Sequence, residues 1–160
     1  MSTVILNGQL SDQRFVHLAD DAEIPAEGTV SVSWTRFNAE ADALAARGHV
    51  VPRLHGDDDI QAILPNASKL DVICLEFPKF VDGRCYSFAT LLRRNGFTGQ
   101  LRAVGDVLKD QVFFYTRCGI DALEIRDDRD AADALKSLND FSVKYQAAID
   151  EPTPIYRRRA

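Results

Sequence analysis

The stretch VICLEFPKFVDGRCYSFATLLRRNGFTGQLRAVGDVLKDQVFFYTRCGIDALEI, residues 72–125, decides the fold. It opens with a continuous apolar run at residues 72–75, which is typical of a strand covered on both faces. A helical stripe follows and ends near Gly96, and after a second apolar run another helical stretch ends at Gly119. Glycine is the usual residue just past the end of a helix. Strands and helices therefore alternate along this stretch.

The same alternation extends toward the N-terminus. Residues 30–34 alternate with period two, and the helical stripe that follows them ends at Gly48. Successive strands are roughly 20–30 residues apart, which is the spacing of βα crossover units. Right-handed crossovers would place these strands in a parallel sheet. We expect an open, mainly parallel α/β sheet, with a half-barrel as the alternative because a complete (β/α)₈ barrel takes ~250 residues.

The two ends of the chain differ from this repeating middle. Asn7-Gly8, after an apolar stretch, predicts an N-terminal β-hairpin with a tight type I′ turn. Apolar residues spaced three and four apart predict a long C-terminal helix over residues 131–149. We therefore expect one α/β domain over residues 1–160, divided into a hairpin and loop at 1–28, βα units with the C-terminal helix at 30–149, and an extended basic tail at 150–160.

Composition excludes several classes of protein. Lys+Arg 19 against Asp+Glu 24 gives a formal charge of 19 − 24 = −5, and without a basic stripe this argues against a nucleic-acid binder. No apolar run approaches the ~20 residues of a membrane span. The N-terminus lacks the features of a signal peptide. The three cysteines follow no disulfide or metal-ligand spacing, so we expect reduced thiols in a cytoplasmic protein that binds no metal.

Polar residues follow three of the predicted strands. In open parallel sheets, ligands bind beyond the carboxyl ends of the strands. These ends carry Asp82-Gly83-Arg84, Gly105-Asp106 and Arg126-Asp127-Asp128. We therefore look for a site among these residues.

Asp82, Gly83 and Arg84 open a predicted helix, where free backbone N–H groups and the helix dipole favour an anion. Gly83 would let a ligand approach the backbone, and Arg84 could grip a carboxylate, phosphate or sulfur oxyanion. A purely structural interpretation is favoured, because capping aspartates are common. In it, Asp82 caps the helix, Gly83 makes the turn, and Arg84 pairs with a surface acid.

Asp106 has the same two interpretations. A carboxylate at a strand end can act as a general acid or base, or it can cap the helix that follows. Asp110 is expected to be exposed, and the role of Gln111 is open. Cys85 near a helix start has the position of a reactive thiol, although a structural role is the simpler interpretation for all three cysteines. No dinucleotide or P-loop motif is present, so the sequence indicates no particular cofactor.

Residues 77–125 resemble a family of uncharacterised bacterial proteins labelled as an oxidoreductase involved in sulfite reduction. The resemblance is strongest over DGR-x-YS at 82–87, LRAVGDVL-x-DQ at 101–111 and RCG at 117–119. Genes of that family tend to lie beside those for assimilatory sulfite reductase. Relatives often carry glycine where this chain has Cys85, which argues against an essential thiol there. The resemblance thus implies a role near sulfite reduction without implying a particular reaction.

The resemblance also implies a set of ligand-binding residues beside Asp106 as the catalytic candidate: Asp82, Gly83, Arg84, Tyr86, Ser87, Arg102, Gly105, Asp110 and Gln111. Our first hypothesis is an accessory protein that binds sulfite reductase or a small anion without turnover. The second is an enzyme acting on a small sulfur-containing or phosphorylated acid, with Asp106 as general base and Arg84 and Arg102 holding the anion. A third is a subunit that buries apolar helix faces in a homodimer.

Overall fold

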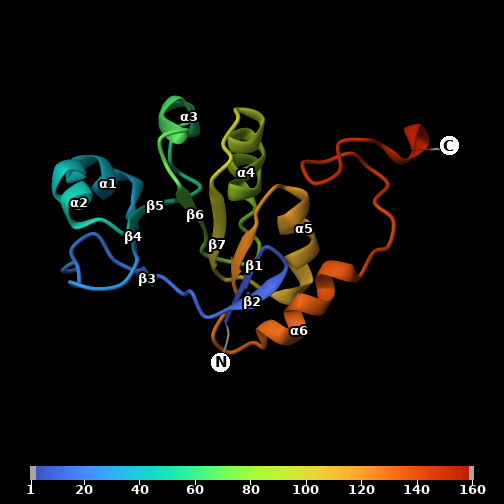
Figure 1. Cartoon of the computed structure of the whole chain (residues 1–160), viewed down its shortest axis with the longest axis horizontal. Helices are drawn as coiled ribbons and strands as arrows, with labels where there is room; N and C mark the ends of the chain where they lie inside the picture. The colour runs from blue at the N-terminus through green and yellow to red at the C-terminus, as the bar shows by residue number, and fades with distance from the viewer. Residues whose placement is uncertain (1–2, 159–160) are drawn as a thin grey trace.

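The computed structural model describes residues 3–158. Its strands are β1 (Val4–Leu6), β2 (Gln9–Ser11), β3 (Val16–His17), β4 (Val30–Ser33), β5 (Val50–Leu54), β6 (Val72–Phe77), β7 (Gln100–Gly105) and β8 (Ala122–Glu124). Its helices are α1 (Trp34–Ala39), α2 (Ala41–Arg47), α3 (Ile60–Ala67), α4 (Arg84–Arg94), α5 (Val112–Arg117) and α6 (Ala131–Lys136), with short 3₁₀ helices η1 (Lys109–Gln111), η2 (Ser137–Asn139) and η3 (Ile155–Arg157). The strands form one sheet in the order β2-β1-β8-β7-β6-β5-β4-β3 (Figure 1).

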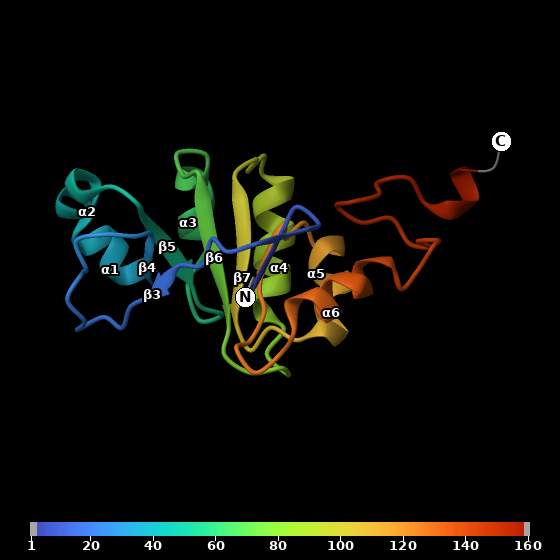
Figure 2. The same cartoon turned by 60° about the horizontal axis from the view of Figure 1, so that its bottom comes forward.

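Strands β3 to β8 are parallel and follow one another in chain order. With right-handed crossovers, this order places the connecting helices on one face of the sheet. The sheet curls into half a barrel with the helices on its convex side (Figures 1 and 2). The prediction of a mainly parallel α/β sheet is confirmed, and the curl corresponds to its half-barrel alternative.

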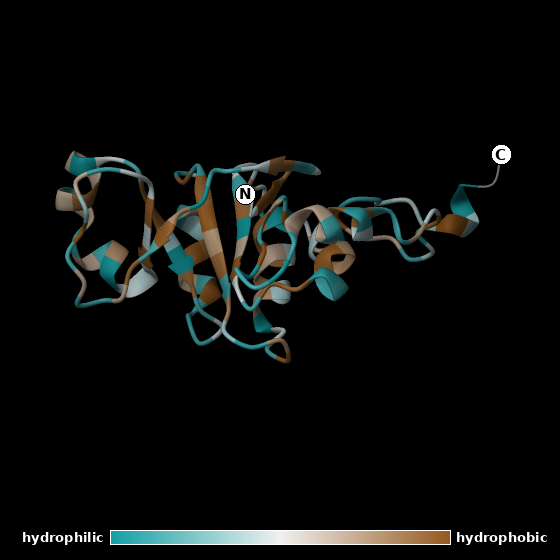
Figure 3. Cartoon of the chain, turned by 90° about the horizontal axis from the view of Figure 1, so that it is seen from below, coloured by the Kyte–Doolittle hydropathy of each residue, from teal (hydrophilic) through white to brown (hydrophobic). Residues whose placement is uncertain are grey.

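The main core lies between the sheet and its helices. Ile73, Leu75 and Leu101 are fully buried there, in one cluster with apolar side chains of α4 and α5. Figure 3 shows hydrophobic residues along the central strands. Because successive side chains of a strand point to opposite faces, Cys74 and Arg102 lie on the other, concave face of the sheet. The concave face thus carries Arg102 beside a small apolar cluster that includes Cys74 and Val104.

The predicted N-terminal hairpin is confirmed. β1 pairs antiparallel with β2 and also with β8, so the hairpin extends the parallel sheet by two strands. Asn7 and Gly8 have φ angles of 50° and 74°, which a two-residue type I′ turn requires. The Asn7-Gly8 turn that the sequence predicts therefore determines how β1 pairs with β2 at this end of the sheet.

A short segment connects the two ends of the sheet across its concave face. Because β2 and β3 lie at opposite ends, the chain between them, residues 12–15, must cross the sheet, and we call it the strap. In Figure 2 it passes across β6 and β7. Phe15 of the strap packs on the concave face against Val51, Cys74 and Val104. The strap therefore covers part of the surface that would line the interior of a complete barrel.

The predicted long helix over residues 131–149 is wrong. α6 has only six residues, η2 adds one turn, and the chain from 140 to 158 is irregular apart from η3. Asn139 and Asp140 are poor helix formers because their side chains compete for backbone hydrogen bonds. The apolar stripe beyond them is covered only in part, since Phe141 contacts the Phe113 ring (centroids 4.8 Å apart) but is still 61% exposed. A helix there would lack the packing that stabilises most protein helices.

We call residues 140–158 the arm. It extends away from the sheet, past α5 and α6 (Figures 1 and 2). The predicted basic tail at 150–160 is the C-terminal part of this arm, and its Arg159 lies outside the described residues.

Candidate functional site

The loop between β6 and α4, residues 78–83, is fixed by hydrogen bonds from the neighbouring strand end. The Phe80 backbone N–H donates to Oδ2 of Asp106 (2.9 Å), and Nε2 of Gln111 donates to the Phe80 carbonyl (3.1 Å). Within the loop, the Asp82 N–H donates to the Lys79 carbonyl (2.9 Å). Asp106 and Gln111, both predicted site residues, therefore both bond to the backbone of Phe80 and hold the β6–α4 loop in place.

Asp106 also joins this loop to the end of β8. Its Oδ1 accepts a hydrogen bond from Nη1 of Arg126 (2.6 Å). Arg126 in turn donates twice to Asp128, at 2.6 and 2.8 Å, and the two aspartates raise the pKa of Arg126. The helix-cap interpretation of Asp106 is wrong, because α5 begins only at Val112 and Leu108 before it is extended. The carboxylate connects three strand ends instead.

Arg84 forms a second charged cluster at the start of α4. Its Nε and Nη2 donate to the two oxygens of Asp82 (3.0 and 2.8 Å), and Nη1 pairs with Asp57. These hydrogen bonds from Arg84 lower the pKa of Asp82 from 3.8 to about 2. Asp57 also lies 3.1 Å from Nδ1 of His55. Arg84 thus clamps the end of the β6–α4 loop to the loop that follows β5.

The N-terminus of α4 differs in detail from the predicted cap. Gly83 is the N-cap residue, and no side chain caps the helix, although Oδ1 of Asp82 accepts weakly from the Arg84 N–H (3.3 Å). Asp82 therefore acts mainly as the ion-pair partner of the Arg84 side chain and contributes little to capping the helix. Asp110 is exposed in η1, as expected, and makes no hydrogen bond to the loop among the described residues.

Tyr86 and Ser87 lie one turn into α4, on the side facing α5. The Tyr86 ring packs against Phe77, Phe114 and Tyr115, with ring centroids 4.8–5.1 Å apart. Burial raises the pKa of Tyr86, and its buried hydroxyl has no hydrogen-bond partner within residues 3–158. Ser87 is exposed and lines a hollow between α4 and α5. Tyr86 therefore packs into the core beside the end of β6, whereas Ser87 lies on the helix surface.

Arg102 lies away from Arg84, on the concave face. Its side chain is 0% exposed, and Nη1 donates to Oε1 of Glu124 (2.7 Å) and to the Gln13 carbonyl of the strap (2.6 Å). Its guanidinium also stacks 3.7 Å from the centre of the Phe15 ring. Arg84 and Arg102 share no contact, so the structure does not bring together the pair expected to hold an anion.

Glu124 is the centre of a network that the sequence did not reveal. It accepts from the Phe15 N–H (3.2 Å) and from Nε2 of His17 (2.9 Å) besides Arg102. Burial acts to raise the pKa of Glu124, but hydrogen bonds from His17 and Arg102 outweigh it and lower the pKa. Nδ1 of His17 lies 2.6 Å from Oγ of Ser31, which completes a Ser-His-Glu chain. Ser31 is fully buried, so this chain holds the strap and presents no nucleophile.

Gly105 and the cysteines have structural roles. Gly105 has a φ of +97°, and a Cβ there would lie 2.5 Å from the Phe77 carbonyl oxygen, so only glycine fits this strand end. Burial raises the pKa of Cys74 and of Cys85 to about 12, and it also raises that of Cys118. These thiols therefore stay protonated at neutral pH. Within residues 3–158, no group of three or more side chains is arranged to hold a metal ion.

A family comparison covers the part of the chain that builds this site. Residues 52–156 match the model of DUF934, described as a bacterial protein of unknown function. The chain belongs to this family. The DUF934 match takes in Asp82, Arg84, Asp106 and Arg126 and most of the arm, whereas the hairpin, the strap and His17 precede it.

Other comparisons add no relative. Searches of curated proteins and of solved structures found no match to this chain. Among the residues that the structure describes, no helix has the length and apolar character needed to cross a membrane.

Proposed function

We propose that this protein is an accessory component of assimilatory sulfite reduction, and that it binds a partner protein through the β6–α4 loop without catalysing a reaction. The observation that carries the proposal is the exposure of Phe80 (46%) and Val81 (85%) on a loop held by Asp106 and Gln111. Because the loop is already held in place, it would lose little conformational entropy when a partner covers these side chains. An exposed aromatic on a fixed loop is the kind of anchor that dominates binding energy.

The charged residues around the loop support binding rather than turnover. Each side-chain nitrogen of Arg84 and of Arg126 already donates to an aspartate. A small anion would have to displace these carboxylates, whereas a protein surface can cover them and leave the pairs intact. The observations therefore favour a protein partner over a small anion at this surface.

The link to sulfite reduction rests on the resemblance over residues 77–125 and on the gene neighbourhood of the resembling family. Sulfite reductase is accordingly the partner that we propose. The residues that carry this resemblance include Asp82, Arg84, Asp106 and Gln111, which shape the β6–α4 loop. If the β6–α4 loop binds sulfite reductase, these residues share one role, which is to fix the conformation of that loop.

Growth of a deletion strain tests the proposed process. We expect growth on cysteine but not on sulfate or sulfite, and rescue by the wild-type gene. A gene carrying Phe80→Ser and Val81→Ser should fail to rescue. The matched control carries Leu10→Ser and Val16→Ser, at positions that are 42% and 49% exposed at the two ends of the sheet, and it should rescue fully.

Binding measured with purified proteins separates the loop from the process. Sulfite reductase should bind the wild type and the control at least tenfold more tightly than the loop variant. Normal growth of the deletion strain on all three sulfur sources would overturn the link to sulfite reduction. Equal binding by the loop variant would overturn the role of the β6–α4 loop.

A further inference from the structure

The arm exposes large apolar side chains over most of its length. Phe141, Val143, Tyr145 and Tyr156 are 59–79% exposed. Large apolar side chains exposed to this extent are typical of an interaction surface on a folded protein. Residues 140–156 also lie within the family match, so the arm is part of what defines the family member.

The arm has a defined conformation, so this exposure does not arise from a loose end. Nη1 of Arg117 on α5 donates to Oδ1 of Asp150 (2.7 Å), and the Ile149 N–H donates to the Arg117 carbonyl (3.2 Å). Farther out, the Ile155 N–H donates to the Tyr145 carbonyl (3.2 Å). This bond brings the chain near Tyr145 beside the chain near Tyr156.

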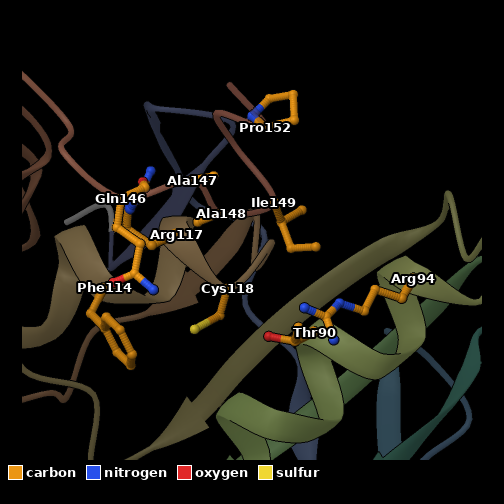
Figure 4. Close-up of a pocket in the computed structure, with 10 residues that line it drawn as sticks. All are labelled: Thr90, Arg94, Phe114, Arg117, Cys118, Gln146, Ala147, Ala148, Ile149 and Pro152. Carbon is orange, nitrogen blue, oxygen red and sulfur yellow. Dashed lines mark hydrogen bonds between the residues drawn. The ribbon is translucent and has the colours of Figure 1, made fainter. Parts of the chain in front are cut away.

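A groove lies between α4 and α5, beside the base of the arm. Figure 4 shows Thr90 and Arg94 of α4 facing Phe114 of α5 and Cys118 just beyond it, with residues 146–149 of the arm along one side. This hollow has a volume of about 460 Å³. A second hollow of about 390 Å³ shares those four residues of the helices and continues past Ser87. Phe114, in the wall of both, is 52% exposed.

We propose that two copies of this chain associate, each laying the part of its arm around Tyr145 and Tyr156 in the α4–α5 groove of the other. The chain carries both the apolar arm and the α4–α5 groove beside it. A twofold axis makes such a pair of surfaces self-complementary, because each copy supplies one arm and one groove. The inference is independent of the proposed function.

The exposed aromatic area is close to the minimum that a specific interface needs. Phe114, Phe141, Tyr145 and Tyr156 are 52–79% exposed, and aromatic side chains bury about 150–250 Å² each, so roughly 500 Å² per copy is open to cover. Two copies would then bury about 1,000 Å² from these side chains alone, which reaches the lower size of specific interfaces. The groove walls and Val143 would add to this area.

Light scattering of the full-length chain during size exclusion tests the inference. At about 100 µM the wild type should have the mass of two 17.8 kDa chains. The variant Tyr145→Ser/Tyr156→Ser should dissociate at least tenfold more readily and elute with the mass of one chain. The control Leu10→Ser/Val16→Ser, which removes two partly exposed apolar side chains elsewhere, should stay dimeric. Circular dichroism would confirm that each variant is folded.

Mixing two defective chains tests whether the arms are exchanged. Thr90→Arg places a long cation in the groove, one turn before Arg94, and should block it. The groove variant and the arm variant should each be monomeric alone. Mixed together, they should form a heterodimer, because one intact arm faces one intact groove.

Three outcomes would overturn the inference. The first is a single-chain mass for the wild type at about 100 µM. The second is an arm variant that dimerises like the wild type. The third is a mixture of the two monomeric variants that forms no heterodimer. An arm variant that still binds sulfite reductase would leave the proposed function standing, so the two proposals fail separately.

Discussion

Arg102 and Arg84 make the same kind of bond in two different places. Both were predicted to hold an anion, and both pair with a carboxylate instead. Arg102 and its partner Glu124 are 0% and 2% exposed beneath the strap, whereas Arg84 is 46% exposed at the strand ends. A buried pair that loses one member leaves an uncompensated charge, but an exposed pair that breaks is solvated. The buried pair therefore supports the fold, and the exposed pair shapes a surface.

Substituting Arg102 should have the largest effect. Arg102→Met removes the cation from the buried pair and leaves Glu124 under the strap, and we expect a loss of about 3–5 kcal/mol in the free energy of unfolding. Urea denaturation would measure it. The double variant Arg102→Met/Glu124→Leu should recover much of the loss, because neither charge then remains buried. Equal destabilisation by the single and double variants would contradict the argument from burial.

Asp106 should show an intermediate effect. Asp106→Ala removes the acceptor for the Phe80 N–H and for Arg126, and it should cost about 1–2 kcal/mol and weaken the binding of sulfite reductase. Asp106→Asn keeps an acceptor for the Phe80 N–H, so it should rescue growth of the deletion strain on sulfite. A stable Asn variant that binds the reductase but fails to rescue would instead support the hypothesis that Asp106 is a general base.

The fold was predictable where local chemistry determines it. Asn7-Gly8 can adopt the positive φ angles of its turn whatever lies around it, and helices closed by Gly96 and Gly119 feed strands directly. The arm was not predictable in the same way. Its apolar residues have helical spacing, but a helix also needs a surface to cover its stripe. Phe141 contacts only part of such a surface, at Phe113, and Tyr145 is 79% exposed.

The site was predictable in part. The polar strand ends do meet at one edge of the sheet, as the parallel arrangement required, and Asp82 is bonded to Arg84 two residues away. The prediction did not place the Arg102 side chain on the concave face. Leu101 and Ala103 on either side of it are core residues, and because successive side chains of a strand alternate, Arg102 points to the other face. The partners Phe80 and Arg126 of Asp106 depend on loop conformation, which no spacing in the sequence reveals.

Arg84→Met should change stability little, in contrast to Arg102→Met. Exposed ion pairs gain little over solvation, so the midpoint of urea unfolding should stay close to that of the wild type. The end of the β6–α4 loop would lose its link to Asp57, and we expect a few-fold weaker binding of sulfite reductase. A midpoint shift as large as that of Arg102→Met would remove the distinction between the two regions.

The titration of Asp82 gives the smallest and most local test. Hydrogen bonds from Arg84 lower its pKa from 3.8 to about 2 in the folded protein. Because the folded pKa is the lower one, the stabilising contribution of this pair is fully present above about pH 4 and is lost as the pH falls through about 2. Carboxyl ¹³C shifts measured against pH should give a midpoint near 2 for Asp82 in the wild type. In Arg84→Met the midpoint should return toward 3.8, whereas an unchanged midpoint would mean that the clamp between Asp82 and Arg84 does not form in solution.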